Sequence, residues 1–175
     1  GPHSALNNFN DFCSIGNIDG YSFTNEIDTK KIISKYLFEP GFRILGVSQR
    51  LLDQELFKLQ VFKYDKKCRY FQYTKGDDVS IVSFNYSLPY GLTIGKMLAD
   101  NNLSYSLFSV NAYAAFDFAP IIKEIKNTKN LIVIDDSKSG NKISDKFLSE
   151  VNTSCDLNKS ILLSRTVQSD WFKPR

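Results

Sequence analysis

The stretch GDDVSIVSFNYSLPYGLTIGKMLADNNLSYSLFSVN, residues 76–111, decides the fold class. Val79 to Phe84 is a short, continuous run of apolar and β-branched residues, which predicts a buried strand. From Leu88 the apolar residues recur at helical spacing until Asn101, which predicts a helix. Leu103 to Val110 predicts a second strand. A strand, a helix and a strand of these lengths form a βαβ unit, so we expect a parallel sheet.

The predicted helix carries its own start signal and two small residues. Ser87 can serve as its N-cap, and Pro89 is tolerated in the first turn because the missing N–H has no partner there. Gly91 and Gly95 lie four residues apart and present bare backbone to one side. Helix pairing in a membrane is the less favoured interpretation, because the flanks are polar and no apolar run reaches spanning length. We therefore expect these glycines to allow close packing of the helix on its sheet.

The composition is that of an ordinary soluble globular protein, with 42% hydrophobic and 23% charged residues. The formal net charge is only +3, and the basic residues are scattered among acidic ones. Nucleic acid is therefore not an expected partner, although the aromatic and basic stretch Val61 to Tyr73 leaves a single-strand platform as a minor alternative. Its second half predicts an edge strand. No signal peptide or membrane-spanning stretch is visible.

Cysteine and histidine usage restricts the chemistry. The three cysteines, Cys13, Cys68 and Cys155, are widely spaced and odd in number, which indicates reduced thiols in a cytoplasmic protein. The one histidine, His3, lies in GPHS, residues 1–4, which we interpret as the remnant of an expression tag. Histidine-based acid–base catalysis and Cys/His metal sites are therefore excluded within this chain.

Before the central unit, a helix is predicted from Glu26 to Phe38 and a strand from Phe42 to Val47. Asp19 and Gly20 favour a turn within Asn17 to Tyr21. Residues 49–66 are the candidate linker, with a possible short helix around Asp53 to Leu59.

After the central unit, Asp117 can cap a helix from Phe118 to Lys126. The remaining predicted elements are a strand at Asn130 to Asp135, a loop at Asp136 to Asn141, a helix at Ile143 to Val151 and a strand at Ser160 to Ser164. The tail ends on Trp171 and Phe172, which we expect to fold back or to meet a partner.

The order of these motifs resembles the C-terminal domain of the transketolase family of thiamine diphosphate enzymes, which includes 2-oxo acid dehydrogenase β subunits and deoxyxylulose-phosphate synthase. Residues 76–82, GDDVSIV, look like the motif that opens that domain. Gly91, Leu92, Gly95 and Leu98 are similar to its first helix. The pair Phe116-Asp117 matches part of a second motif, and residues 131–136 resemble its acidic strand end. Residues 17–47 also resemble the last helix and strand of the preceding pyrimidine-binding domain.

The resemblance implies a three-layer α/β fold: an open, mostly parallel sheet with an antiparallel edge strand and helices on both faces. It implies a tag remnant at 1–4, the tail of a pyrimidine-binding-like domain at 5–48, a linker at 49–66 and a transketolase C-terminal-like domain at 67–175. The resemblance implies that the chain serves assembly. Its expected partners are the missing N-terminal domains or a partner subunit, and a homodimer is expected. Thiamine diphosphate and a divalent cation are expected for the complete enzyme and no cofactor for this chain alone.

The candidate ligand contacts are Asp135, Asp136, Ser139 and Gly140. The two aspartates stand at a strand's carboxyl end, where open α/β sheets bind ligands, and could hold a divalent cation or a sugar hydroxyl. Capping of the Ser137 to Asn141 turn by one of them is the favoured alternative. Ser139 and Gly140 slightly resemble a phosphate loop, but the full motif is absent.

The sequence leaves two further residues and two further functions open. Arg43 and Arg50 could meet a substrate anion in a complete enzyme, although surface solvation is their favoured role. The main alternative function is a free-standing, non-catalytic α/β module that binds a partner protein or a small anion through Asp135 to Asn141 and the aromatic tail. A flavodoxin-like nucleotide-binding enzyme is disfavoured, because no glycine-rich phosphate loop follows the first strand.

Overall fold

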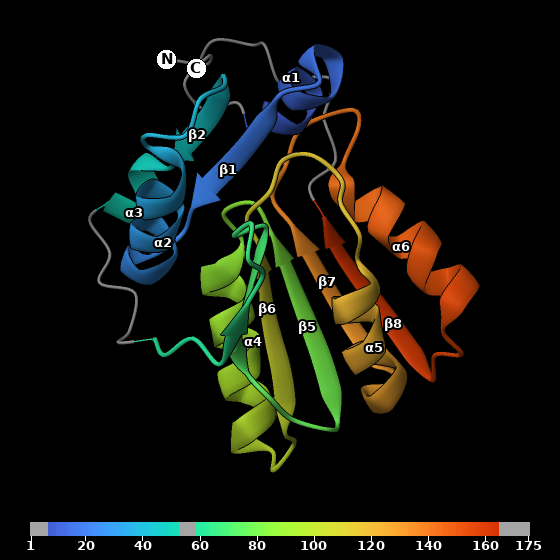
Figure 1. The fold of residues 1–175 in the computed structure, drawn as a ribbon. Coiled ribbons are helices and arrows are strands. Elements are labelled where there is room, and N and C mark those ends of the chain that lie inside the picture. The colour runs from blue at the N-terminus through green and yellow to red at the C-terminus, as the bar shows by residue number, and fades with distance from the viewer. Residues whose placement is uncertain (1–6, 53–58, 165–175) are drawn as a thin grey trace, which may run out of the picture.

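The computed structural model describes residues 7–52 and 59–164. Within them a six-stranded, mostly parallel sheet carries helices on both faces, and a two-stranded parallel sheet lies across one end of it (Figure 1). The strand order of the large sheet is β3-β4-β6-β5-β7-β8. The predicted α/β class, with an antiparallel edge and helices on both faces, is confirmed.

The large sheet consists of β3 (Lys63–Tyr64), β4 (Tyr70–Thr74), β5 (Val79–Phe84), β6 (Tyr105–Val110), β7 (Asn130–Asp135) and β8 (Lys159–Ser164). The small sheet pairs β1 (Asp19–Phe23) with β2 (Arg43–Val47) in parallel. The helices are α1 (Phe9–Gly16), α2 (Glu26–Tyr36), α3 (Gln49–Leu52), α4 (Leu88–Asp100), α5 (Ala119–Thr128) and α6 (Ile143–Ser154). From β5 to β8 the elements alternate as the sequence predicts, and β5, β6, β7 and β8 are parallel neighbours.

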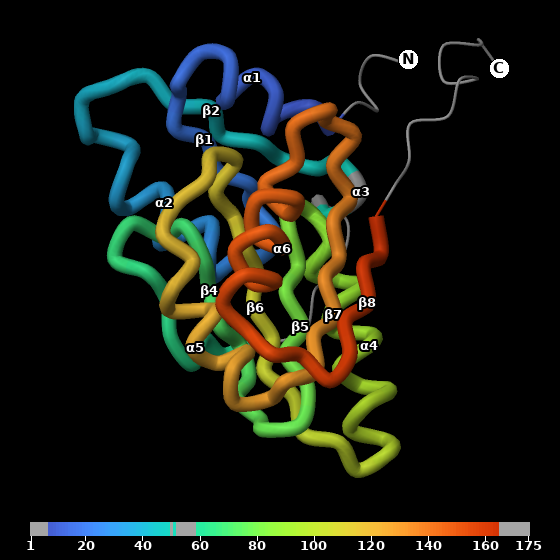
Figure 2. The backbone as a smooth tube through the Cα atoms, turned by 90° about the vertical axis from the view of Figure 1, so that its right-hand side faces the viewer, coloured from blue at the N-terminus to red at the C-terminus, as the bar shows by residue number. Residues whose placement is uncertain are grey.

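Successive side chains of the central strands point to opposite faces of the sheet, and each face packs into its own apolar core. On β5, Val82 and Phe84 join the core that α5 and α6 cover, whereas Val79 and Ile81 join the core beneath α4 and α2. Figure 2 shows the sheet from the side, with α4 on one face and α5 and α6 on the other. A strand buried on both faces is rich in apolar residues, as β5 is, although its two serines, Ser80 and Ser83, are buried with them.

The glycines of α4 fill the role that their spacing predicts. Gly91 and Gly95 are buried against the sheet. A Cβ on Gly91 would lie 2.4 Å from the Ser83 Oγ atom, and a Cβ on Gly95 would lie 2.5 Å from the Tyr105 ring. Only a residue without a Cβ lets the helix approach this closely.

Ser87 occupies the N-cap position of α4, but its side chain does not cap the helix. Its hydroxyl group donates instead to the carbonyl oxygens of Phe84, at 2.8 Å, and of Ile134, at 2.9 Å. The hydroxyl thereby joins the ends of β5 and β7. The Asp117 carboxylate accepts from the Ala119 backbone N–H at 2.9 Å, but α5 begins at Ala119 with Phe118 at the N-cap, so Asp117 stands one position before the cap that was predicted for it.

The turn expected within Asn17 to Tyr21 falls at Asn17, which ends α1 in the left-handed conformation, and not at Asp19 and Gly20, which begin β1. Gly20, taken as a turn former, serves close packing instead. A Cβ there would lie 2.6 Å from the Cys13 Sγ atom and 2.7 Å from the Tyr113 ring. Pairing with β2 and this packing override the local turn preference.

The edge strand expected in the second half of Val61 to Tyr73 is also placed differently. β4 lies inside the sheet, between β6 and β3, and its first four residues are buried. The true edge is the two-residue strand β3, which is exposed. The short helix expected around Asp53 to Leu59 lies largely outside the described residues, and the predicted domain boundaries stay a prediction.

A buried polar network joins the small sheet to the large one. The Asn111 side chain, just after β6, donates to the Ser22 carbonyl oxygen and to the Asp28 carboxylate, both at 2.8 Å. Asp28 is fully buried near the start of α2, where it also accepts from the Thr24 hydroxyl group and from the Asn25 backbone N–H. The Asn25 side chain in turn caps the helix, which completes a capping box. The network fixes the start of α2 over the end of β6.

Replacing Gly91 by Ala is expected to lower the free energy of unfolding by about 1–3 kcal/mol, because the added methyl group overpacks the contact with Ser83. Urea denaturation measures the change. Gly140→Ala is the matched control, since the nearest heavy atom to its Cβ is 4.0 Å away. A Gly91→Ala variant as stable as the original chain would contradict the close packing.

Burial raises the pKa of the Asp28 carboxyl group above its ordinary value of 3.8, despite hydrogen bonds that lower it. Folding therefore takes up a proton between the unfolded and folded pKa values. The contribution of Asp28 to stability is fully present below pH 3.8 and is lost as the pH rises through the folded pKa. The stability of the original chain relative to Asp28→Asn should thus fall between acidic and neutral pH, as measured by urea denaturation at both. If the stability of the original chain relative to Asp28→Asn rose with pH instead, the pKa of Asp28 would not be raised by folding.

Candidate functional site

The carboxyl end of β7 places the two predicted aspartates in buried positions. The Asp135 side chain accepts from the Asn85 amide and the Ser137 backbone N–H, each at 2.8 Å, and from the Ser144 hydroxyl group at 2.5 Å. The Asp136 side chain accepts from the Tyr86 backbone N–H at 3.1 Å. The contact between Asp135 and Ser137 confirms that one of the pair caps the following turn.

The loop after Asp136 is held by the first helix. The backbone N–H groups of Gly140 and Asn141 both donate to the Asp11 carboxylate, at 3.0 Å. The Ser139 hydroxyl group is buried and accepts from the Asp11 backbone N–H at 3.3 Å. A carboxylate of the chain itself thus occupies the amides that a phosphate would need. The structure brings the four predicted residues together, and their role as ligand contacts stays a prediction.

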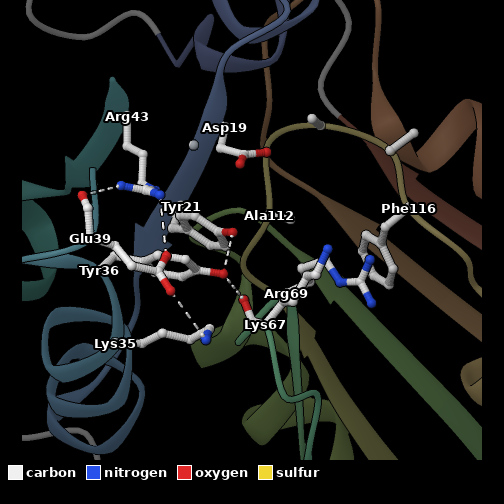
Figure 3. A pocket seen from close by; sticks show the side chains of 13 residues that line it. Asp19, Tyr21, Lys35, Tyr36, Glu39, Arg43, Lys67, Arg69, Ala112 and Phe116 are labelled. Atoms are coloured by element: carbon white, nitrogen blue, oxygen red, sulfur yellow. Dashed lines mark hydrogen bonds and ion pairs between the residues drawn. The ribbon is translucent and has the colours of Figure 1, made fainter. Parts of the chain in front are cut away.

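A cleft of about 270 Å³ lies between the small sheet with α2 on one side and the β3–β4 turn and the loop after β6 on the other (Figure 3). We call it the Tyr36 cleft. Its lining residues are Asp19, Gly20, Tyr21, Lys35, Tyr36, Glu39, Arg43, Lys67, Arg69, Ala112, Ala114, Ala115 and Phe116. Four of them are cationic, and they come from segments far apart in the sequence.

Two tyrosines form one wall of the Tyr36 cleft. Their rings stack with centroids 4.7 Å apart, and the Tyr21 hydroxyl group donates to that of Tyr36 at 2.8 Å. The Tyr36 hydroxyl group donates in turn to the Lys67 carbonyl oxygen at 2.7 Å. Burial raises the pKa of both tyrosines, so both stay protonated at neutral pH. They are therefore neutral hydrogen-bonding groups and not bases.

Behind this wall, Glu39 is shared by two cations. An Arg43 guanidinium nitrogen lies 3.2 Å from the Glu39 carboxylate, and the Lys35 amine lies 3.6 Å from it. The Arg43 guanidinium also lies 4.8 Å from the centroid of the Tyr36 ring. Only 15% of the Arg43 side chain is exposed, so the favoured role of surface solvation does not hold for this residue. Its charge pairs with Glu39, whose side chain is 45% exposed.

The opposite wall carries Arg69, which is held from two sides. Its Nε and Nη2 atoms donate to the two Asp65 carboxylate oxygens at 2.7 and 3.1 Å, and its guanidinium lies 4.9 Å from the centroid of the Phe116 ring. Burial opposes ionisation of Asp65, but the hydrogen bonds and charge of Arg69 lower its pKa. The two engaged nitrogens leave the third, Nη1, for other acceptors.

The sequence points to Arg43 as a residue that could meet an anion but not to the rest of the Tyr36 cleft. The available signal was the Asp65 and Arg69 pair, spaced four apart in a turn. No pattern in the sequence links that pair to Tyr21 or Tyr36, because tertiary packing alone brings them together.

Among the residues that the structure describes, no group of three or more His, Cys, Asp or Glu side chains could hold a metal ion. The described part of the chain also contains no helix long and apolar enough to cross a membrane.

Neither a protein-family model nor a curated protein matches the sequence. Solved structures do match in fold. A split-gene transketolase, described as an inactive β4 tetramer, aligns with a TM-score of 0.63 and 14% identity over 86% of this chain and 49% of its own. A transketolase from Campylobacter jejuni subsp. jejuni NCTC 11168 aligns with a TM-score of 0.54 and 12% identity, over 87% of this chain and 22% of its own. One from Pichia stipitis gives 0.56 and 12%, over 89% and 22%.

The chain thus spans about half of the split-gene transketolase chain and about a fifth of the other two. Identities this low establish the fold and not the activity. The chain has the fold of the C-terminal part of transketolase, as the motif order from Gly76 onward predicts.

Proposed function

We propose that this chain is the C-terminal part of a transketolase-like, thiamine diphosphate-dependent enzyme, where it serves subunit assembly. Catalysis, the thiamine diphosphate site and its divalent cation belong to other domains of the complete enzyme. The observation that carries the proposal is the small sheet, which ends in an open edge.

That sheet has two strands only among the described residues, and β2 pairs with β1 alone. Parallel sheets are normally buried within larger sheets, and two strands by themselves are marginally stable. The outer edge of β2 therefore offers backbone N–H and C=O groups to a further strand.

The same region exposes large apolar side chains. Phe38 is 90% exposed, Phe42 is 76% exposed and Val47 is 50% exposed. Leu37 and Leu45 are exposed as well, so the residues lie within one stretch of eleven that ends with β2. Exposed apolar surface on this scale marks an interaction site.

We assign this surface, in the isolated chain, to a second copy of the same chain. Two β2 edges related by a two-fold axis would pair antiparallel and would cover both apolar faces at once, as an isologous interface requires. Support comes from the split-gene transketolase, whose β chains form a tetramer without activity.

Leu45→Lys is expected to weaken self-association about tenfold or more, because it removes roughly 1–3 kcal/mol of apolar burial and places like charges across the two-fold axis. Sedimentation equilibrium measures the dissociation constant. Met97→Lys on α4, at a side chain 61% exposed, is the matched control and should associate like the original chain. An original chain that stays monomeric at high micromolar concentration rules out this role of β2.

The isolated chain should show no turnover of a ketose phosphate when thiamine diphosphate and Mg²⁺ are supplied, whereas a full-length transketolase assayed beside it should. A turnover that depends on thiamine diphosphate would overturn the division of labour proposed here.

The alternative function is a free-standing module that binds a partner or an anion through the loop from Asp135 to Asn141. The contacts of this loop do not favour it. The amides of Gly140 and Asn141 are already bonded to Asp11. The aromatic tail, with Trp171 and Phe172, lies outside the described residues.

A further inference from the structure

The Tyr36 cleft has a pattern of charge that its internal ion pairs leave incomplete. Glu39 pairs with two cations, Lys35 and Arg43, so this group keeps one positive charge in surplus, and Asp65 is matched by Arg69. These contacts stabilise the walls and leave two charged side chains over.

The two are Asp19 and Lys67. Both are exposed and line the cleft, and within the described part of the chain neither side chain makes a hydrogen bond or an ion pair. Asp19 begins β1, next to the tyrosine wall, whereas Lys67 belongs to the β3–β4 turn that also carries Arg69. One carboxylate and one ammonium group thus face the same cleft from different elements.

Arg69, which lies on the same β3–β4 turn as Lys67, supplies further hydrogen-bond donors. The Nη1 atom of Arg69 is not used by Asp65, and the guanidinium is held in place by Asp65 and Phe116. Arg69 therefore offers N–H groups in a fixed direction, a geometry suited to a carboxylate. The tyrosine hydroxyl groups between the two charged sides are neutral.

The rest of the lining is small and apolar. Ala112, Ala114 and Ala115 come from the loop after β6, and Phe116 follows them. The volume of about 270 Å³ is just below the roughly 300–1,000 Å³ of sites for drug-sized ligands. The occupant must therefore be small, with one apolar group.

We propose that the Tyr36 cleft binds an α-amino acid with an apolar side chain. Its ammonium group pairs with Asp19, its carboxylate pairs with Lys67 and the Nη1 atom of Arg69, and its side chain contacts the alanines. A ligand with one charge of each sign satisfies both unmatched groups, which a simple anion does not.

Isothermal titration calorimetry of the chain with L-leucine tests the proposal. The two matched probes are isocaproate, which lacks the amine, and isoamylamine, which lacks the carboxylate. Leucine should bind about tenfold or more tightly than either probe. Absence of leucine binding at millimolar concentration overturns the proposal, and so does isocaproate binding as tightly as leucine, which would define a plain anion site.

Two variants separate the charges. Asp19→Asn should weaken leucine and isoamylamine about tenfold and leave isocaproate unchanged. Lys67→Met should weaken leucine and isocaproate and leave isoamylamine unchanged. The controls are Asp156→Asn and Lys123→Met, which change exposed charges outside the cleft lining. Controls that weaken leucine as much as the cleft variants would reveal a general charge effect and refute the site.

This site is independent of the assembly role. Leu45→Lys, which is designed to break self-association, should bind leucine as the original chain does. Asp19→Asn should conversely lose leucine binding and keep its self-association, which would show that the amino acid site and the β2 interface are separate.

Discussion

The side-chain amide of Asn111 is the contact on which the arrangement of the two sheets depends. It leaves the end of β6 and reaches both the Ser22 carbonyl oxygen and the Asp28 carboxylate. The main chain adds a hydrogen bond of 2.7 Å from the Ser22 N–H to the Asn111 carbonyl oxygen. All three residues are fully buried, so an unmatched group among them would cost about 1–3 kcal/mol. This strict matching fixes the position of α2, and hence the distance from Tyr36 to the β3–β4 turn.

The docking of the small sheet also decides where a ligand can enter. Open α/β sheets usually bind ligands at the carboxyl ends of their strands. Here residues before β2 cover that edge: Asp11 holds the loop after β7, and β1 bridges to Ala112 after β6. A cavity of about 380 Å³ nevertheless remains at the carboxyl ends of β7 and β8, where Asp135 and Asp136 line it, and the Tyr36 cleft lies between α2 and the β3–β4 turn. The Tyr36 cleft thus owes its walls to the docking of the small sheet beside the loop after β6.

The sequence predicts those elements of the fold whose residue pattern is contained in one short stretch of the chain. Val79 to Phe84 and Asn130 to Asp135 were predicted at their observed bounds, because strands buried on both faces are dominated by apolar and β-branched residues. β1 was missed because its buried residues include Gly20 and Ser22, whose places are set by packing and by the contact with Asn111.

The residues of the candidate site also divide into those that a local sequence pattern predicts and those that only tertiary packing brings together. Asp135 and Asp136 could be found because they end a recognisable strand. The turn that Asp135 caps was foreseen too, since aspartate side chains commonly bond the backbone two residues on. The partners in the Tyr36 cleft could not be found, because Tyr21, Tyr36 and Arg69 meet only after the small sheet has docked.

The pairing of Asp11 with the loop after β7 has an evolutionary meaning. The chain already holds two backbone amides aimed at one negatively charged group, and an internal residue fills their place. The same carboxylate holds the loop in place, so a lineage that lost it would free the two amides and release the loop at once. A new anion site at this edge would therefore need a second contact that takes over the task of holding the loop.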